Sequence, residues 1–164
     1  MTPSNNARPK SQYTVFLCRL DSGNSSCSCP SVFSRCAGRC WLPLGEVPNV
    51  SEALQACADL EVAAHLATPR SAEENQCVAL LAFGTSVLVA LGFSGGPTVE
   101  SLVGEDGCGP PEYTNWDVDA GEPQFSDSPS CVFMSADTRL WYDAGCAGST
   151  QFICQLEHCY RPEC

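Results

Sequence analysis

The sequence predicts a disulfide-rich α+β fold in which two helices flank antiparallel sheets. Its segments run in the order strand, helix, strand, helix, strand, long irregular loop and three strands. Helices that lie beside an antiparallel sheet, rather than after every strand, are typical of this class. The 164-residue chain also contains 13 cysteines, and about 8% cysteine is a proportion typical of disulfide-linked scaffolds.

The first 28 residues are rich in Ser, Asn and Pro, a composition that favours a flexible leader. A short strand is expected at 13–17, and Cys18 and Cys27 could close a small loop. Residues 1–10 contain no apolar segment like that of a signal peptide. If the protein is secreted, we therefore expect that its signal has been removed or that this is a partial or engineered chain.

Folded structure is expected from Cys29 onward. Residues 29–41 suggest a hairpin closed by a disulfide. Asn49 or Ser51 can then cap a helix, because apolar residues recur after them at helical spacing. This periodicity predicts a helix over 51–61.

A strand, a second helix and a buried strand follow. The segment 64–68 reads as a short strand ended by proline. Ser71 and Glu74 form the pattern of a capping box, which predicts a helix over 72–83. The uninterrupted apolar run at 87–93 is consistent with a central buried strand.

Residues 94–130 contain six glycines and five prolines. A long irregular segment inside a compact domain indicates a functional loop or disorder. Three strands are expected after it, at 131–134, 138–142 and 151–156. The domain division is therefore a leader at 1–28, a folded domain at 29–157 and a cysteine-containing tail at 158–164.

The cysteines favour an oxidising, extracellular compartment, because cytosolic proteins keep their thiols reduced. Two N-x-S sequons, at Asn24 and Asn49, agree with a secretory route and with a glycoprotein. Because 13 is odd, one thiol is free or pairs with another chain, which suggests a disulfide-linked oligomer. Zinc sites are the alternative, but the close cysteine pairs form no repeated C-x2-C motif and the two histidines lie far from them.

The chain is strongly acidic, with a formal net charge of −11. Between Ser71 and Thr138 there are eleven Asp and Glu residues and no Lys or Arg. Nucleic acids and anionic membranes need a positive surface, so both are excluded as partners. An acidic surface suits divalent cations, basic partners or simple solubility.

Oxygen-bearing side chains gather in the second half of the chain. Glu122-Pro123-Gln124 places a carboxylate and an amide beside a proline, and Asp143 follows 21 residues after Glu122. Cysteines bracket the set. Because calcium prefers oxygen ligands, this pattern indicates a calcium site.

The order and spacing of these motifs resemble the long form of the C-type lectin-like domain, as in secreted invertebrate-type lectins. The resemblance covers residues 29–157. The segments that carry it are Cys29-Pro30 with Phe33 and Gly38-Arg39-Cys40, Ala64-His65-Leu66-Ala67 with Ser71 and Glu74, Val89-Ala90-Leu91-Gly92, Tyr113-Thr114-Asn115-Trp116, and Trp141-Tyr142-Asp143 with Cys146 and Cys154.

The resemblance implies three disulfides, Cys29–Cys40, Cys57–Cys154 and Cys131–Cys146. It assigns no partners to Cys18, Cys27, Cys36, Cys77, Cys108, Cys159 and Cys164. For these, a Cys77–Cys108 pair and a terminal pair involving Cys159 or Cys164 are guesses. The resemblance also implies that Trp116, Trp141 and Phe152 pack in the core rather than stack on sugars.

The resemblance implies that Glu122, Gln124 and Asp143 bind calcium and the sugar hydroxyls held by that ion. Gln124 stands where the family usually has Asn or Asp, and Tyr142 replaces an asparagine. The acid usually found just before the cysteine at 131 is absent, and Asp127 could compensate as a fourth metal ligand. Calcium requires six to eight oxygens, so the altered positions weaken the expected site.

The function implied is that of a secreted carbohydrate-binding domain, calcium-linked, that recognises cell-surface or microbial glycans or glycoproteins in innate immunity. The alternative is a lectin-like protein-binding or structural module without calcium-dependent sugar binding. The altered residues at 124 and 142 favour that alternative.

An enzyme is not expected. Gly92-Phe93-Ser94-Gly95-Gly96 fits the G-x-S-x-G pattern, but that motif needs a helix directly after the serine. Pro97 opposes such a helix. His65 lies only 29 residues before Ser94, too close for a two-barrel serine protease.

Overall fold

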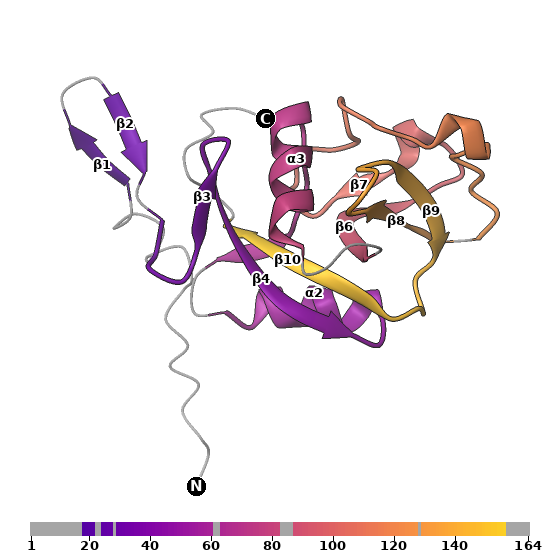
Figure 1. The fold of residues 1–164 in the computed structure, drawn as a ribbon, viewed down its shortest axis with the longest axis horizontal. Helices are drawn as coiled ribbons and strands as arrows, with labels where there is room; N and C mark the ends of the chain where they lie inside the picture. Colours follow the sequence, from indigo (N-terminus) through magenta and orange to yellow (C-terminus); the bar gives the residue numbers. More distant parts are fainter. Residues whose placement is uncertain are drawn as a thin grey trace, which may run out of the picture.

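The computed structural model describes residues 18–21, 24–27, 29–60, 63–82, 87–127 and 129–156. Within them, one eight-stranded sheet forms the framework, and Figure 1 shows helices α2 and α3 beside it. The strands follow the order β3 (Ser34–Cys36), β4 (Arg39–Val47), β10 (Thr150–Leu156), β6 (Leu88–Gly95), β8 (Ser130–Ser135) and β9 (Trp141–Gly145), with β5 (Ala64–Leu66) beside β10 and β7 (Val103–Gly104) beside β6.

All but one of the strand pairs are antiparallel, as predicted. The exception is the central pair of β6 and β10, which is parallel, with Gln151 opposite Val89. A separate two-stranded sheet, β1 (Cys18–Asp21) and β2 (Asn24–Cys27), lies within the segment expected to be a flexible leader, and places Cys18 opposite Cys27. The strand expected at 13–17 falls outside the described residues.

Both predicted helices are present, as α2 (Val50–Ala58) and α3 (Ala72–Leu81). Asn49 caps α2, since its Oδ1 accepts a hydrogen bond of 2.9 Å from the Glu52 N–H. Ser71 caps α3 by accepting from the Glu74 N–H at 3.2 Å. Glu74 reaches back as expected, but to the N–H of Arg70 at 2.7 Å, one residue before the position that a capping box uses.

The strand expected at 138–142 begins instead at Trp141. Residues 136–138 form a turn, and Arg139 takes a positive φ of 64° before the chain enters β9. The loop expected at 94–130 is ordered around the short strand β7 and two 3-10 turns, η1 (Val99–Ser101) and η2 (Val118–Ala120). Among the described residues, no helix is both long enough and apolar enough to cross a membrane.

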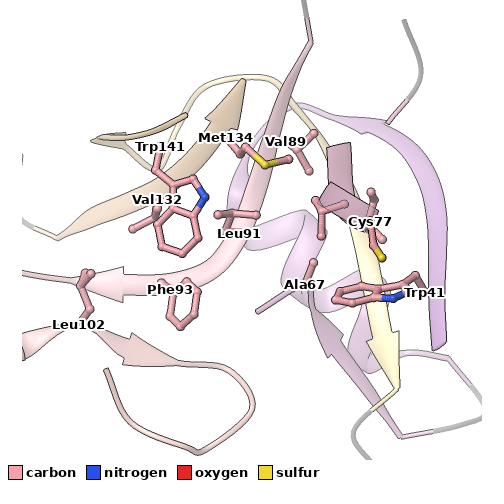
Figure 2. Packing of buried hydrophobic residues seen from close by; sticks show 12 residues of the cluster. Trp41, Ala67, Cys77, Val89, Leu91, Phe93, Leu102, Val132, Met134 and Trp141 are labelled. Carbon is pink, nitrogen blue, oxygen red and sulfur yellow. The ribbon is translucent and has the colours of Figure 1, made fainter. Parts of the chain in front are cut away.

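The main core joins side chains of the sheet to Cys77 and Val78 of α3, and Figure 2 shows how the side chains of this cluster pack. Trp141 is fully buried. Its indole N–H donates a 2.7 Å hydrogen bond to Oδ1 of Asn75 on α3. Phe152 is also buried, at 3% exposure, so the expectation that these two aromatic residues pack in the core is confirmed.

The three disulfides implied by the resemblance are present, Cys29–Cys40, Cys57–Cys154 and Cys131–Cys146. A fourth joins Cys36 to Cys77 and links the first hairpin to α3. The suggested Cys77–Cys108 pair is therefore wrong, because β3 and α3 bring Cys36 within 5.9 Å (Cα–Cα) of Cys77. Cys108 is itself disulfide-bonded.

Gly92 on β6 has no room for a side chain. A Cβ there would lie 2.7 Å from the backbone oxygen of Leu66 and 2.8 Å from Cγ2 of Thr68. Because a backbone atom cannot rotate away, we expect Gly92→Ala to lower the free energy of unfolding by at least the ~1–3 kcal/mol typical of overpacked cores. Denaturant unfolding checks this, with Gly148→Ala as the control, since a Cβ at Gly148 would have nothing within 4 Å. Equal stability of the two variants would contradict the close approach.

Candidate functional site

The residues expected to form the binding site converge where the loop after η2 meets strand β9. The N–H of Gln124 donates a 2.7 Å hydrogen bond to Oδ1 of Asp143. The Gln124 side-chain amide donates to Oε1 of Glu122 at 3.0 Å, and the N–H of Asp143 lies 3.4 Å from the other Glu122 oxygen. Three of the four predicted ligands therefore form one hydrogen-bonded set.

Ser130 contributes a fourth member that sequence reasoning treated only as a missing acid. Its Oγ lies 3.0 Å from Oδ2 of Asp143 and 2.9 Å from the backbone oxygen of Asp127. A hydroxyl has one proton, so these two acceptors share it. Asp143 is only 8% exposed, and both of its oxygens thus face protein donors.

Asp127, the fourth predicted ligand, lies beside the end of β9. Its Oδ2 is 3.5 Å from the position that a Cβ on Gly145 would take. The side chain is exposed. The structure therefore places the Asp127 carboxylate beside Gly145, which follows Asp143 by two residues on β9, and only the backbone oxygen of Asp127 contacts the hydrogen-bonded set.

Tyr142 fills the position where the resemblance expects an asparagine. Its ring stacks on Phe133, with centroids 5.9 Å apart and an interplanar angle of 19°. Its hydroxyl is buried without a hydrogen-bond partner among the described residues. Burial, together with the negative charge of Glu122, raises the pKa of Tyr142 to about 12. The phenol is therefore neutral at physiological pH and cannot supply a charged ligand.

This donor set does not match a calcium shell. Calcium takes six to eight oxygens at 2.3–2.6 Å. The oxygens of Glu122 and Asp143 instead accept hydrogen bonds from the protein. Within the described part of the chain, no group of three or more His, Cys, Asp or Glu side chains is placed to hold a metal ion.

Aromatic contacts fix the loop that carries Gln124. Phe125 has a positive φ of 48°. Its ring contacts Trp116 edge to face, with ring centroids 6.1 Å apart, and the ring centroids of Trp116 and Trp141 are 5.7 Å apart. Trp116 is partly buried, so it packs against the core as expected. The loop is thereby attached to the fully buried Trp141 on β9.

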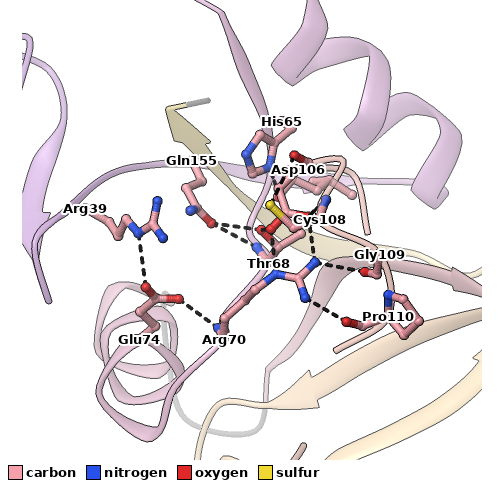
Figure 3. Close-up of polar contacts among 11 residues, drawn as sticks. Arg39, His65, Thr68, Arg70, Glu74, Asp106, Cys108, Gly109, Pro110 and Gln155 are labelled. Atoms are coloured by element: carbon pink, nitrogen blue, oxygen red, sulfur yellow. Dashed lines mark hydrogen bonds and ion pairs between the residues drawn. The ribbon is translucent and has the colours of Figure 1, made fainter. Parts of the chain in front are cut away.

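A polar cluster anchors the start of the long loop (Figure 3). Arg70 makes two hydrogen bonds of 2.7 Å to the carboxylate of Asp106 and donates to the backbone oxygens of Gly109 and Pro110 at 2.9 and 2.7 Å. Its guanidinium also lies 5.3 Å from the ring centroid of Phe93. Sequence reasoning missed this cluster. The available signal was that the acidic stretch after Arg70 contains no cation of its own.

Because of this cluster, we expect the free energy of unfolding to depend on pH in the acid range. Burial acts to raise the pKa of Asp106, but hydrogen bonds from Arg70 and the Cys108 N–H, with the charge of Arg70, lower it overall. A folded-state pKa below the unfolded value stabilises the fold above the ordinary Asp range, near 3.9, and this contribution is lost as the pH falls through the folded pKa. We expect the free energy of unfolding to fall less steeply with acidification in Asp106→Asn than in the wild type. An equal dependence of the free energy of unfolding on pH in the two proteins would contradict the lowered pKa of Asp106.

The serine motif lies in a context unlike that of a hydrolase. Gly92 to Gly95 is part of strand β6, and the chain continues into the turn at Gly96 and Pro97 rather than into a helix. A nucleophile elbow requires a sharp turn from strand to helix at the serine. Ser94 is therefore not placed as such a nucleophile.

Comparison with known proteins agrees with the fold. The family model for the lectin C-type domain matches residues 46–156. Snaclec 3 of Sistrurus catenatus edwardsii is 25% identical over 150 residues, which cover 87% of this chain and 94% of that protein.

Solved structures show the same architecture. The crystal structure of CEL-IV matches with a TM-score of 0.67 and 25% identity, over 83% of this chain and 99% of that one. A calcium-independent type II antifreeze protein matches with a TM-score of 0.64 and 24% identity, over 78% of this chain and 93% of that one. A Ca2+-dependent type II antifreeze protein, in its Ca2+-free form, matches with a TM-score of 0.65 and 22% identity, over 77% and 98%.

Proposed function

The chain belongs to the C-type lectin domain family, and on that premise we propose that it is a secreted recognition module that works without a resident calcium ion. It would contact glycans or glycoproteins directly through Glu122 and Gln124, and the buried carboxylate of Asp143 would hold Gln124 in position by accepting its backbone N–H. The observation that carries this proposal is the hydrogen bonding of both carboxylates by the protein's own donors.

The internal hydrogen bonds take the place of an ion. The N–H of Gln124 donates to one oxygen of Asp143, and the hydroxyl of Ser130 shares its single proton between the other oxygen and the carbonyl of Asp127. Hydrogen bonds to charged groups contribute about 1.5–3 kcal/mol each, so an ion that displaced them would lose much of its own binding energy. A neighbour of the same fold is described as calcium-independent, which supports an ion-free use of the fold.

The exposed side of the set suits a hydroxyl-rich ligand. Gln124 is exposed and Glu122 is partly exposed, so an amide and a carboxylate lie beside each other at the surface. Sugar hydroxyls both donate and accept hydrogen bonds, and this pair offers both kinds of partner. The net charge of −11 favours neutral or basic ligands over acidic ones.

Secretion is supported by the cysteines. Four disulfides join described cysteines, and Cys108 is bonded as well. Such a density of disulfides persists in oxidising compartments and is rare in the cytosol.

Binding to an array of glycans and glycoproteins, in millimolar calcium and in a chelator, tests the proposal. We expect the same ligands to bind with equal affinity in both conditions. Glu122→Gln should weaken binding, whereas the matched exposed-acid variant Glu100→Gln should not. Binding that disappears in the chelator, or that is indifferent to Glu122→Gln, would contradict the proposal.

Calcium-linked sugar binding is the second candidate. The convergence of Glu122, Gln124 and Asp143 favours it, as does the carboxylate of Asp127, which lies beside Gly145 of β9. If calcium binds through these side chains, Gln124→Asn combined with Tyr142→Asn should raise calcium affinity. The first change moves the amide carbonyl back by one methylene to the expected position, and the second supplies an amide carbonyl in place of the phenol. Unchanged affinity in a calcium titration would remove this candidate.

A further inference from the structure

We propose that Asn49 carries an N-linked glycan and that a recess beside the start of α2 holds its first sugar. Asn49-Val50-Ser51 is a sequon. Here the structure shows how the modified side chain remains compatible with the fold.

The two polar atoms of the Asn49 side chain have separate roles. Its Oδ1 caps α2 by accepting from the Glu52 N–H at 2.9 Å. Its Nδ2 makes only a long contact, 3.4 Å, to the exposed carboxylate of Glu52. The glycan would therefore be attached to Nδ2, an atom that takes no part in capping the helix.

Glycan transfer leaves this cap intact. A bond forms between Nδ2 and the anomeric carbon of the first sugar, and that carbon's bond to the pyrophosphate of a lipid-linked donor breaks. Nδ2 loses one proton and keeps one N–H. Oδ1 is unchanged, so the capping hydrogen bond persists, and with it the ~1 kcal/mol that an N-cap typically contributes.

Asn49 is one of the residues that line an open recess of about 570 Å³. Ser51 and Glu52 give it a polar side, and Pro129 and Ala147 give it an apolar side. A hydrogen bond of 3.1 Å from the Val50 N–H to the Cys146 carbonyl fixes the start of α2 against this wall. An acetamido sugar, with hydroxyls on its edges and apolar faces, matches such a surface.

The recess also borders an apolar cavity of about 210 Å³ between α2 and β6. Ser51, Pro129 and Cys146 line both spaces. A sugar in the recess would therefore lie beside this cavity, whose apolar lining includes Leu54 and Leu91.

The test uses the full chain, expressed behind a secretion signal in eukaryotic cells. Asn24→Gln removes the other sequon. We expect this variant to lose the mass of one glycan on treatment with peptide N-glycosidase, with residue 49 recovered as aspartate. Recovery of the peptide with unmodified Asn49 would overturn the proposal.

Two matched variants exclude a folding artefact. Ser51→Ala keeps the Asn49 cap, and Asn49→Asp keeps a capping oxygen, so both should fold while removing the sequon. In the Asn24→Gln background each should be secreted without the glycan mass. A glycan that persists in either variant would place the modification elsewhere and contradict the assignment.

Discussion

Removal of the Cys57–Cys154 disulfide should lower the free energy of unfolding by about 4–5 kcal/mol in the chain-entropy model, in which long closed loops contribute most. The bond joins α2 to β10 across 97 residues of sequence, and both cysteines are fully buried. It therefore restricts more of the unfolded chain than any other described disulfide. Guanidinium unfolding of Cys57→Ala/Cys154→Ala under non-reducing conditions measures the effect.

The Cys131–Cys146 disulfide supplies the matched control. It closes only 15 residues, for which the same model gives about 3 kcal/mol. The paired alanine substitutions there should destabilise the protein less than those at 57 and 154. The reverse order would contradict loop closure as the main contribution.

Replacement of Arg70 by alanine should cost about 3–5 kcal/mol, the range for breaking a buried ion pair from one side. The Arg70 and Asp106 side chains are 5% and 12% exposed. Without the guanidinium, Asp106 keeps a largely buried charge, and the carbonyls of Gly109 and Pro110 lose their donor. Denaturant unfolding measures the loss.

Arg35→Ala is the control for this prediction. Arg35 is exposed on β3, and surface substitutions usually change stability by no more than about 0.5 kcal/mol. Arg70→Lys should recover only part of the loss, because an ammonium cannot reproduce the two-pronged contact of a guanidinium with a carboxylate. A cost below about 1 kcal/mol for Arg70→Ala would contradict the anchoring role of the cluster.

Periodicity and capping residues predicted most of the fold. The helices at α2 and α3 begin beside Asn49 and Ser71 because those side chains accept N–H groups that have no partner inside the helix. Strand β9 begins later than predicted, because Thr138 belongs to a turn and Arg139 takes a positive φ, and neither residue type excludes a strand. The parallel pairing of β6 with β10 depends on contacts between distant segments, which no local pattern encodes.

Some of the disulfides could be predicted from the sequence and others could not. Three pairs followed from the resemblance, whereas Cys36–Cys77 required the position of the first hairpin against α3. Spacing in the sequence carries no information on that contact, so Cys77 was paired wrongly with Cys108.

The residues predicted for the candidate site lie together in the structure, but not all of their contacts were predicted. The sequence identified Glu122, Gln124 and Asp143, and the structure brings them together. It did not reveal that Ser130 donates toward Asp143, because the serine was considered only as the replacement of an acidic residue that the family usually has near that position. It also did not reveal that Tyr142 buries its hydroxyl against Phe133.

Thermal unfolding of the oxidised protein in calcium and in a chelator tests the central claim most directly. A ligand that binds only the native state raises the melting temperature. Because the carboxylates of Glu122 and Asp143 are already hydrogen-bonded within the protein, we predict superimposable unfolding curves. A clear rise in melting temperature with calcium, lost in Glu122→Gln, would contradict the ion-free site and identify Glu122 as a calcium ligand.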